Sequence, residues 1–215
     1  MASFLVTAGP TREHLDDVRF LSNGSTGRMG YSLVQAALDA GHRVVLASGP
    51  TQLEPPVGAE VRQVVSAQDM LAAVEEALDG ADVVIGAAAV ADARPAVRYP
   101  GKPPKSAAAT IELVPNPDII AAAAAAGGRP RAVLGFALQS LDQGVAAALE
   151  RGRAKLRRKA LDAIAINAVA AMGASTSEVV VAFADGREES LGHASKAVTA
   201  ARLVEIGLEL WRSKR

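Results

Sequence analysis

The 215-residue sequence contains no cysteine, so disulfides, thiolate metal sites and a cysteine nucleophile are excluded. Aromatic residues make up only 3% of the chain, although 50% of its residues are hydrophobic. We therefore expect a core of alanine and aliphatic side chains, with helices packed closely on a sheet. No signal peptide is visible, and the apolar tract at residues 121–126 is far too short to span a bilayer. The expectation is a cytoplasmic protein that acts without a membrane.

An excess of charge of either sign is also absent, because 23 Lys and Arg residues balance 23 Asp and Glu residues. Such a chain has no overall field that would attract nucleic acid or a membrane surface. Its length fits one large domain better than two, so we expect a single domain over residues 1–215 with a sizeable core.

Strand-like apolar runs alternate with helical patterns along the chain. We expect strands at residues 4–8, 43–48, 61–65, 81–88, 110–114, 131–137 and 163–167, and helices at residues 27–40, 66–78, 116–126, 141–160 and 194–211. Asp185-Gly186 joins two further runs, residues 178–184 and 188–191, as in a β-hairpin. This order predicts an α/β fold: a Rossmann-like, doubly wound, mainly parallel sheet in a three-layer α/β/α sandwich with a late β-hairpin.

Local signals refine this expectation. Ser66 and Asp69 resemble a capping box, and Asn116 is expected to N-cap a helix that has Pro117 at its first position. The connection over residues 9–27 is longer than a usual strand-to-helix loop, and such loops are often functional. Residues 93–109 are rich in Pro, Lys, Arg and Ala, and we expect them to form a flexible flap.

A glycine-rich stretch connects the first expected strand to the first helix. Gly24, Gly27 and Gly30 allow tight turns and a close approach of a ligand to the backbone. A turn of this kind presents backbone N–H groups at a helix start, which suits a phosphate or carboxylate. The same stretch carries polar and charged side chains: Ser22, Asn23, Ser25, Thr26 and Arg28. The alternative is a loop that only starts a helix, because glycine spacing alone gives many false positives.

Further candidates directly follow expected strands. They are Arg19 and Asn23, residues 89–92, residues 116–119, residues 135–136, and Asn167. Ligands of open α/β sheets bind beyond the carboxyl ends of the strands, so we expect these residues to meet in one crevice.

Three ordered blocks, residues 7–13, 17–23 and 25–31, resemble the opening of bacterial phosphopantothenoylcysteine synthetases. The blocks Ala88–Asp92 and Asn116–Ile119 also resemble that family, and the resemblance extends over nearly the whole chain. The family joins 4′-phosphopantothenate to L-cysteine in coenzyme A biosynthesis. The resemblance therefore implies a ligase that uses CTP, with Mg²⁺ as cofactor.

The resemblance also implies roles for individual residues. Asn23, Lys102 and Arg19 are expected to be catalytic, with Lys102 as a cation in the flap. Nucleotide contacts are expected at Gly86, Ala87, Ala88, Asp92, Lys102, Pro117, Asp118, Ile119, Ile120, Phe136, Lys155 and Lys159. The phosphate and substrate loop is expected to comprise Ser22, Gly24, Ser25, Thr26, Gly27 and Gly30, together with Ala89 and Asn167. The metal ligands are not identified.

The implied reaction has two steps. The phosphopantothenate carboxylate attacks the α-phosphate of CTP, pyrophosphate leaves, and the cysteine amine then attacks the resulting acyl-cytidylate to give phosphopantothenoylcysteine and CMP. Mg²⁺ and lysines would hold the pyrophosphate. The family suggests a homodimer formed through the late hairpin. Because the first expected strand begins at residue 4, we expect any phosphopantothenoylcysteine decarboxylase to be a separate partner.

The sequence departs from the family pattern at several positions. Pro103 and Pro104 replace the middle of a Lys-Ile-Lys-Lys run, Gln139 replaces a glutamate, and Ala168 replaces an aspartate. Residues 172–177 also replace a stretch rich in Phe, Asp and Asn. These changes affect the flap, the metal or cysteine environment and the dimer edge, and leave the nucleotide blocks intact.

Two rival functions stay open. An NAD(P)-dependent reductase would share the fold, but the sequence has no Gly-x-Gly-x-x-Gly, no Tyr-x-x-x-Lys and no acidic residue at residues 47–49. A nucleic-acid-binding module could use the basic run at residues 151–159. Lys155 and Lys159 are four apart on one helix face, and no aromatics are interleaved, which favours a triphosphate.

Overall fold

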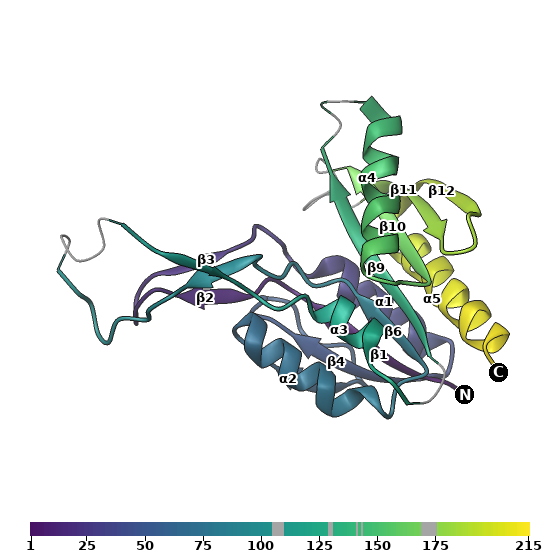
Figure 1. Cartoon of the computed structure of the whole chain (residues 1–215). Helices are drawn as coiled ribbons and strands as arrows, with labels where there is room; N and C mark the ends of the chain where they lie inside the picture. The colour runs from purple at the N-terminus through teal and green to yellow at the C-terminus, as the bar shows by residue number, and fades with distance from the viewer. Residues whose placement is uncertain (105–109, 129–130, 141, 143, 169–175) are drawn as a thin grey trace.

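The computed structural model describes the chain except for residues 105–109, 129–130, 141, 143 and 169–175. In this described part, eight strands form one sheet in the order β12-β11-β10-β9-β6-β1-β4-β5 (Figure 1). Their bounds are β1 Ser3–Ala8, β4 Arg43–Ser48, β5 Glu60–Gln63, β6 Val83–Gly86, β9 Ala132–Gln139, β10 Ala163–Ala168, β11 Thr176–Phe183 and β12 Glu188–Ser195. The six neighbouring strands β5, β4, β1, β6, β9 and β10 are parallel, whereas β11 and β12 form an antiparallel hairpin at the edge. The predicted mainly parallel sheet with a late hairpin is confirmed.

Helices cover both faces of this sheet (Figure 1). The helices α1 (Arg28–Asp39) and α5 (Lys196–Ser213) lie on one face, and α2 (Ala67–Leu78), α3 (Ile119–Ala125) and α4 (Gly144–Arg158) lie on the other. Side chains of a strand alternate between the two faces. Phe4 and Val6 accordingly pack in the core under α1 and α5, and Leu5 packs in the opposite core. This arrangement confirms the three-layer sandwich.

Two helix starts follow from local chemistry. The capping box of α2 is present, because Ser66 Oγ accepts a hydrogen bond from Asp69 N at 3.2 Å and Asp69 Oδ2 accepts one from Ser66 N at 2.9 Å. The backbone hydrogen bond from Ser66 lowers the pKa of Asp69. Helix α1 instead begins after Gly27, whose φ of 78° is a left-handed conformation that glycine adopts readily.

An arm projects from the sheet (Figure 1). In it β2 (Arg12–His14) pairs with β3 (Phe20–Ser22), and β7 (Ala93–Pro95) pairs with β8 (Leu113–Pro115). The two ribbons are tied together by the Asp17 carboxylate, which accepts a hydrogen bond from Gly101 N at 3.0 Å. The long connection expected over residues 9–27 thus contains β2 and β3, which the sequence did not reveal because strands of three residues carry too little periodicity to be recognised. Residues 105–109 of the expected flap lie outside the described residues.

Other expected boundaries also differ. Helix α3 is N-capped by Asp118 rather than Asn116, with the Asp118 side chain accepting from Ala121 N at 3.3 Å. Asn116 bonds instead to the preceding segment, donating from Nδ2 to the Ala91 carbonyl at 2.9 Å. Strand β6 ends at Gly86, and α4 begins at Gly144. None of the helices in the described residues combines the length and apolar character needed to cross a bilayer.

Candidate functional site

The site lies where the sheet order changes direction. From β1 the chain proceeds to β4 and β5 on one side, and later elements continue from β6 to β9 and β10 on the other. Ligands of such sheets bind beyond the carboxyl ends of the strands at this switch point. A cavity of about 290 Å³ opens there and is lined by Thr7 at the end of β1, Gly86 at the end of β6, and Phe136 of β9. A cavity is therefore present at the predicted edge of the sheet, although Arg19 and Asn23 are not among its lining residues.

The backbone beyond β6 is fixed against the backbone beyond β1. Ala89 N donates to the Gly9 carbonyl at 2.9 Å, and Pro10 and Ala89 form a parallel bridge. Thr11 Oγ1 also accepts from Ala91 N at 3.0 Å. Small residues at 86–91 thus form a wall in which the ligand would face backbone rather than side chains. Gly86 lets this wall lie close to α3, since a Cβ there would lie 2.8 Å from Ile120 Cδ1.

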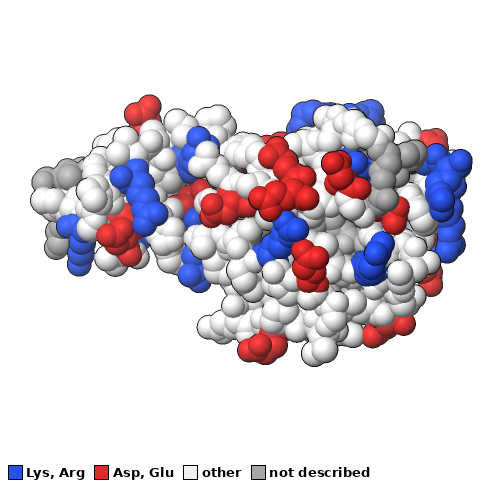
Figure 2. Space-filling view, turned by 90° about the horizontal axis from the view of Figure 1, so that it is seen from below, with Lys and Arg blue, Asp and Glu red and all other residues white. Residues whose placement is uncertain are grey.

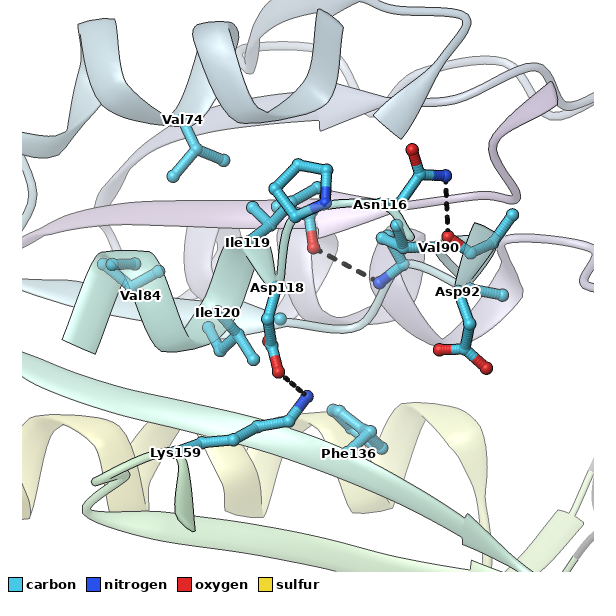
Figure 3. A pocket seen from close by; sticks show the side chains of 17 residues that line it. Val74, Val84, Val90, Asp92, Asn116, Asp118, Ile119, Ile120, Phe136 and Lys159 are labelled. Carbon is cyan, nitrogen blue, oxygen red and sulfur yellow. Dashed lines mark hydrogen bonds and ion pairs between the residues drawn. The ribbon is translucent and has the colours of Figure 1, made fainter. Parts of the chain in front are cut away.

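The first cavity combines an apolar floor with polar groups at one end (Figure 3). Val74, Val84 and Ile119 supply apolar surface, and Asp92 and Asn116 supply polar groups. Most of the predicted nucleotide contacts line it: Gly86, Ala88, Asp92, Pro117, Asp118, Ile119, Ile120, Phe136 and Lys159. Such a cavity can hold a flat, partly apolar group together with an anion.

Lys159 reaches across this cavity to the opposite wall. Its Nζ lies 3.0 Å from Asp118 Oδ2, and the pair joins the segment after α4 to the N-cap of α3 (Figure 3). Lys155 is half-buried one turn earlier; burial lowers its pKa, and the charge of Lys159 lowers it further. The negative charge of Asp92 raises the pKa of Lys155. Lys159 therefore places positive charge in the cavity lining, whereas Lys155 is not among the lining residues.

A second cavity of about 180 Å³ adjoins the first. Its lining is Ser25, Thr26, Gly27, Arg28, Met29, Ala87, Ala88, Ala89, Phe136, Leu138, Asn167 and Lys196. Ala88, Ala89 and Phe136 line both cavities, so the two are contiguous. Five residues expected in the substrate loop, Ser25, Thr26, Gly27, Ala89 and Asn167, border this second cavity.

Asn23 is exposed and lines neither cavity, but its side chain is bonded to backbone that lines them. Its Nδ2 donates to the carbonyl of Ala89 at 3.0 Å and to that of Val90 at 3.1 Å. Ser22 holds the same loop from its other side, with Oγ donating to the Thr11 carbonyl at 2.7 Å. Gly30 has a packing role, because a Cβ there would lie 2.4 Å from the Cβ of Ala8. Gly24 does not adopt a positive φ, in contrast to Gly27.

Arg19 and Lys102 are not among the residues that line either cavity; both lie on the arm. The Arg19 guanidinium pairs with Asp16, with Nη2 2.6 Å from Oδ2. Burial tends to raise the pKa of Asp16, but hydrogen bonds from Arg19 and Val18 outweigh this and lower it to about 2. Lys102 is exposed next to Gly101. Hence the structure does not bring these two predicted catalytic residues together with the other site residues.

Sequence reasoning missed several lining residues. Lys196 opens the last helix and Leu138 is in β9, yet both border the second cavity. Asn116 was expected both as a helix cap and as a crevice residue; it lines the first cavity, and the cap is Asp118 instead. The replacement residue Gln139 is buried and accepts a hydrogen bond from Arg151 Nε at 3.1 Å. No local sequence pattern marks Lys196 as a site residue. It borders the second cavity only because of where α5 begins in the fold.

The sheet order and the double cavity at its switch point define a Rossmann-like α/β protein with a ligand crevice. Residues 1–209 match the family model described as DNA/pantothenate metabolism flavoprotein C-terminal domain, and the chain belongs to this family.

Similar proteins agree with this family. The chain is 42% identical over 212 residues to the coenzyme A biosynthesis bifunctional protein CoaBC of Mycobacterium tuberculosis, covering 94% of this chain and 50% of the relative. It is 41% identical over 199 residues to CoaBC of Bacillus subtilis, covering 89% and 47%. The chain thus spans about half the length of these curated relatives.

Solved structures show the same architecture. The C-terminal domain of a CoaBC protein superposes with a TM-score of 0.81 at 35% identity, covering 97% of this chain and 95% of that one. A Cab2 mutant in complex with phosphopantothenate-cysteine has a TM-score of 0.78 at 16% identity, covering 99% and 88%. The second likeness shows the fold alone.

Proposed function

We propose that this chain joins 4′-phosphopantothenate to L-cysteine at the expense of CTP, through an acyl-cytidylate, in coenzyme A biosynthesis. The observation that carries the proposal is the pair of cavities that meet at Ala88, Ala89 and Phe136. A two-substrate activation needs one site for the nucleotide and one for the acid, with the reacting atoms at their junction. The family and its CoaBC relatives supply the substrate class.

In the first step a carboxylate oxygen of the acid forms a bond to the α-phosphorus as the bond to the bridging oxygen of the β-phosphate breaks. Pyrophosphate leaves with the electron pair. Lys155 and Lys159 are placed to bind the negative charge that develops on it. Lys102 would stabilise the α-phosphate, a role that requires its arm segment to approach the nucleotide.

In the second step the cysteine nitrogen forms the amide bond as the acyl carbon–oxygen bond breaks and CMP leaves. The nitrogen loses its proton during this attack. Asn23 donates both Nδ2 hydrogens to the carbonyls of Ala89 and Val90, so it would have to exchange one of these bonds to donate to the acyl carbonyl. A fixed amide of this kind can orient the carbonyl under attack.

The acidic residues fit a nucleotide-bound Mg²⁺ rather than a protein cage. Among the described residues there is no group of three or more His, Cys, Asp or Glu side chains arranged to hold a metal. Asp92 is a carboxylate that lines the nucleotide cavity, and it would hold the ion together with phosphate oxygens and water, the usual coordination of Mg²⁺. When bound, the ion would neutralise charge on the triphosphate.

The proposal also includes a cytoplasmic homodimer. The edge position of β12 supports the dimer, since an edge strand offers backbone groups to a second chain. A nucleic-acid module is less well supported, because Arg157 pairs with Glu150 at 2.8 Å and Arg153 pairs with Glu188. Acidic and basic side chains are also interspersed over the face shown in Figure 2.

The experiment is a single-turnover quench with mass analysis. Protein is mixed with CTP and 4′-phosphopantothenate, with and without cysteine, and parallel samples contain ATP or NADPH. We expect an acyl-cytidylate and pyrophosphate without cysteine, and the amide and CMP with it. Absence of a cysteine-independent intermediate would contradict the two-step mechanism. Thermal unfolding is measured separately with CTP, ATP, NADPH or an RNA oligomer. Stabilisation by NADPH alone would support the reductase instead, and stabilisation by the RNA oligomer alone would support the nucleic-acid module.

A further inference from the structure

Asn116 bonds to two successive carbonyls of the wall beyond β6. Its backbone N donates to the Asp92 carbonyl at 2.8 Å, and its Nδ2 donates to the Ala91 carbonyl at 2.9 Å (Figure 3). On the other side Ala91 N donates to Thr11 Oγ1 at 3.0 Å, so this short piece of backbone is held from two elements. The Asp92 side chain starts from the held backbone and lines the first cavity. The direction of its carboxylate therefore depends on Asn116.

The Asn116 carboxamide is itself oriented by Arg94. One nitrogen of the guanidinium, Nη1, donates to Asn116 Oδ1 at 3.2 Å and to the Pro115 carbonyl at 2.7 Å. A guanidinium can only donate hydrogen bonds, and a backbone carbonyl can only accept them. Asn116 Oδ1 must therefore face Arg94, and Nδ2 must face Ala91. Turning the amide over would set donor against donor and acceptor against acceptor.

Arg94 does not border the space that a ligand would fill. It is half-buried in β7 and is not among the lining residues of either cavity, whereas Asn116 lines the first. Arg94 can thus affect a bound nucleotide only through residues that do line the cavity. Its bonds lead through Asn116 to the backbone of Asp92.

A purely structural role for Arg94 is the alternative. The base of the arm is already closed by the pairing of β7 with β8, and Ala96 N donates to the Glu112 carbonyl at 2.9 Å next to this pairing. These bonds do not need a carboxamide of fixed orientation. The Asn116 amide instead reaches the cavity wall, which favours a role in positioning Asp92.

We propose that Arg94 is a positioning residue of the nucleotide site: by orienting the Asn116 carboxamide it fixes the direction in which the Asp92 carboxylate meets the nucleotide. This inference rests on the proposed function, in which Asp92 binds CTP together with Mg²⁺. Arginine suits the role because its rigid fork fixes the direction of each donor, whereas a lysine ammonium is a rotatable point charge. Residues that hold a metal-binding side chain typically change metal affinity or activity about 10- to 100-fold when they are replaced.

The test compares Arg94→Met, Arg94→Lys, Asn116→Asp and Asn116→Leu with the wild type. Methionine has a long unbranched side chain but no hydrogen-bond donor. Arg62→Met is the matched control, because Arg62 is also a half-buried arginine in a strand, and its partners are Glu60 and Glu76. Calorimetry measures the affinities for CTP with Mg²⁺ and for 4′-phosphopantothenate. Thermal unfolding and amide formation are recorded for each protein.

Arg94→Met should weaken the binding of CTP with Mg²⁺ about 10-fold or more, because the Asn116 amide loses the donor that orients it. Both Asn116 variants should show a similar loss. Aspartate keeps a partner for Arg94 but sets an oxygen against the Ala91 carbonyl, and leucine removes the bond without adding charge. Arg94→Lys should recover part of the loss.

The affinity for 4′-phosphopantothenate should match the wild type in all these variants, and the Arg62 control should match it for both ligands. A loss of affinity shared by both ligands, or no loss for CTP in Arg94→Met, would overturn the positioning role.

A double-variant cycle with Asp92→Asn tests whether Arg94 acts through Asp92. If it does, Arg94→Met should cause little further loss of CTP affinity in the Asp92→Asn background, because the group that it positions is gone. Losses that add in the double variant would overturn the proposal, since a general loosening of the fold weakens binding in both backgrounds alike. Wild-type affinity for CTP in Asp92→Asn alone would also overturn it.

The two proposals can fail separately. If CTP binds and the cycle gives the expected result, but no amide forms with cysteine, Arg94 keeps its positioning role and the ligase function falls. If the amide forms and every variant binds CTP as the wild type does, the ligase function stands and the positioning role falls. If the wild type binds no CTP, the positioning role is rejected.

Discussion

Lys159 Nζ and Asp118 Oδ2 lie 3.0 Å apart across the first cavity, so the cation proposed to bind the triphosphate is paired with a carboxylate. The side chains of Lys159 and Asp118 are 23% and 43% exposed, so the pair lies in a partly solvated setting. Pairs of this kind contribute about 0–1 kcal/mol to stability. A triphosphate, with its higher charge, can therefore replace Asp118 as the partner of Lys159 at little energetic cost.

Replacing both Lys155 and Lys159 with Gln should raise the apparent constant for CTP and leave the melting temperature of the ligand-free protein nearly unchanged. The reason is that the lysines lie beside the nucleotide cavity and contribute little to the fold. CTP titration and thermal unfolding measure the two effects. Asp118→Asn serves as a control for the ion pair, because asparagine caps a helix about as well as aspartate. Unchanged affinity for CTP would show that the lysines are only solvated.

Gly27→Ala should impair substrate binding and stability, whereas Gly24→Ala should affect both much less. Gly27 has a φ of 78°, and a Cβ there would lie 3.2 Å from Thr51 Cγ2. A non-glycine residue in this conformation costs about 1–2 kcal/mol. Gly24 has no positive φ, so alanine meets no such backbone penalty. Urea unfolding and calorimetry with 4′-phosphopantothenate would test this difference, and equal behaviour of the two variants would refute it.

The Asp16 carboxyl should make the protein sensitive to acid. Its pKa in the folded chain is about 2, below its ordinary value of 3.8, so the carboxylate stabilises the fold above about pH 4. That stabilisation is lost as the pH falls from 3.8 through about 2. In Asp16→Asn the urea midpoint should fall less steeply over this interval than in the wild type, whereas at pH 7 the variant should be the less stable one. Parallel curves for the two proteins would contradict the assignment.

Asn23→Ala and Lys102→Ala should fail at different steps. Lys102→Ala should abolish pyrophosphate release, because charge on the α-phosphate develops only in the first step. Asn23→Ala should keep one burst of pyrophosphate, retain the acyl-cytidylate and slow amide formation by about 10²–10³-fold, the typical effect of losing one donor, if Asn23 exchanges a backbone bond for the acyl oxygen. The quench assay with and without cysteine measures both steps. Loss of the first step in both variants would refute this division of roles.

Local chemistry made some elements predictable to the residue. The capping box at Ser66 and Asp69 places the start of α2, and the buried run Arg43–Ser48 is β4 with the bounds that the sequence indicates. The carboxyl-end rule also predicted that residues 89–92 and 116–119 would meet, and both segments line the first cavity. What could not be predicted is that Asn116 does not cap the helix, because a residue before Pro-Asp is compatible both with a helix cap and with a side chain turned toward Ala91.

By itself the sequence determined the layers of the fold, since the periods of 2 and 3.6 residues depend only on neighbours along the chain. It also determined which blocks resemble a nucleotide-dependent ligase. Only the tertiary structure decided that Lys196 joins Arg28 in one cavity and that Arg19 is held by Asp16 on an arm. The tertiary structure also decided that the strands Ala93–Pro95 and Leu113–Pro115 pair with each other. These relationships depend on strand order and on the packing of helices distant in sequence, and such contacts leave no periodic signal in the chain that forms them.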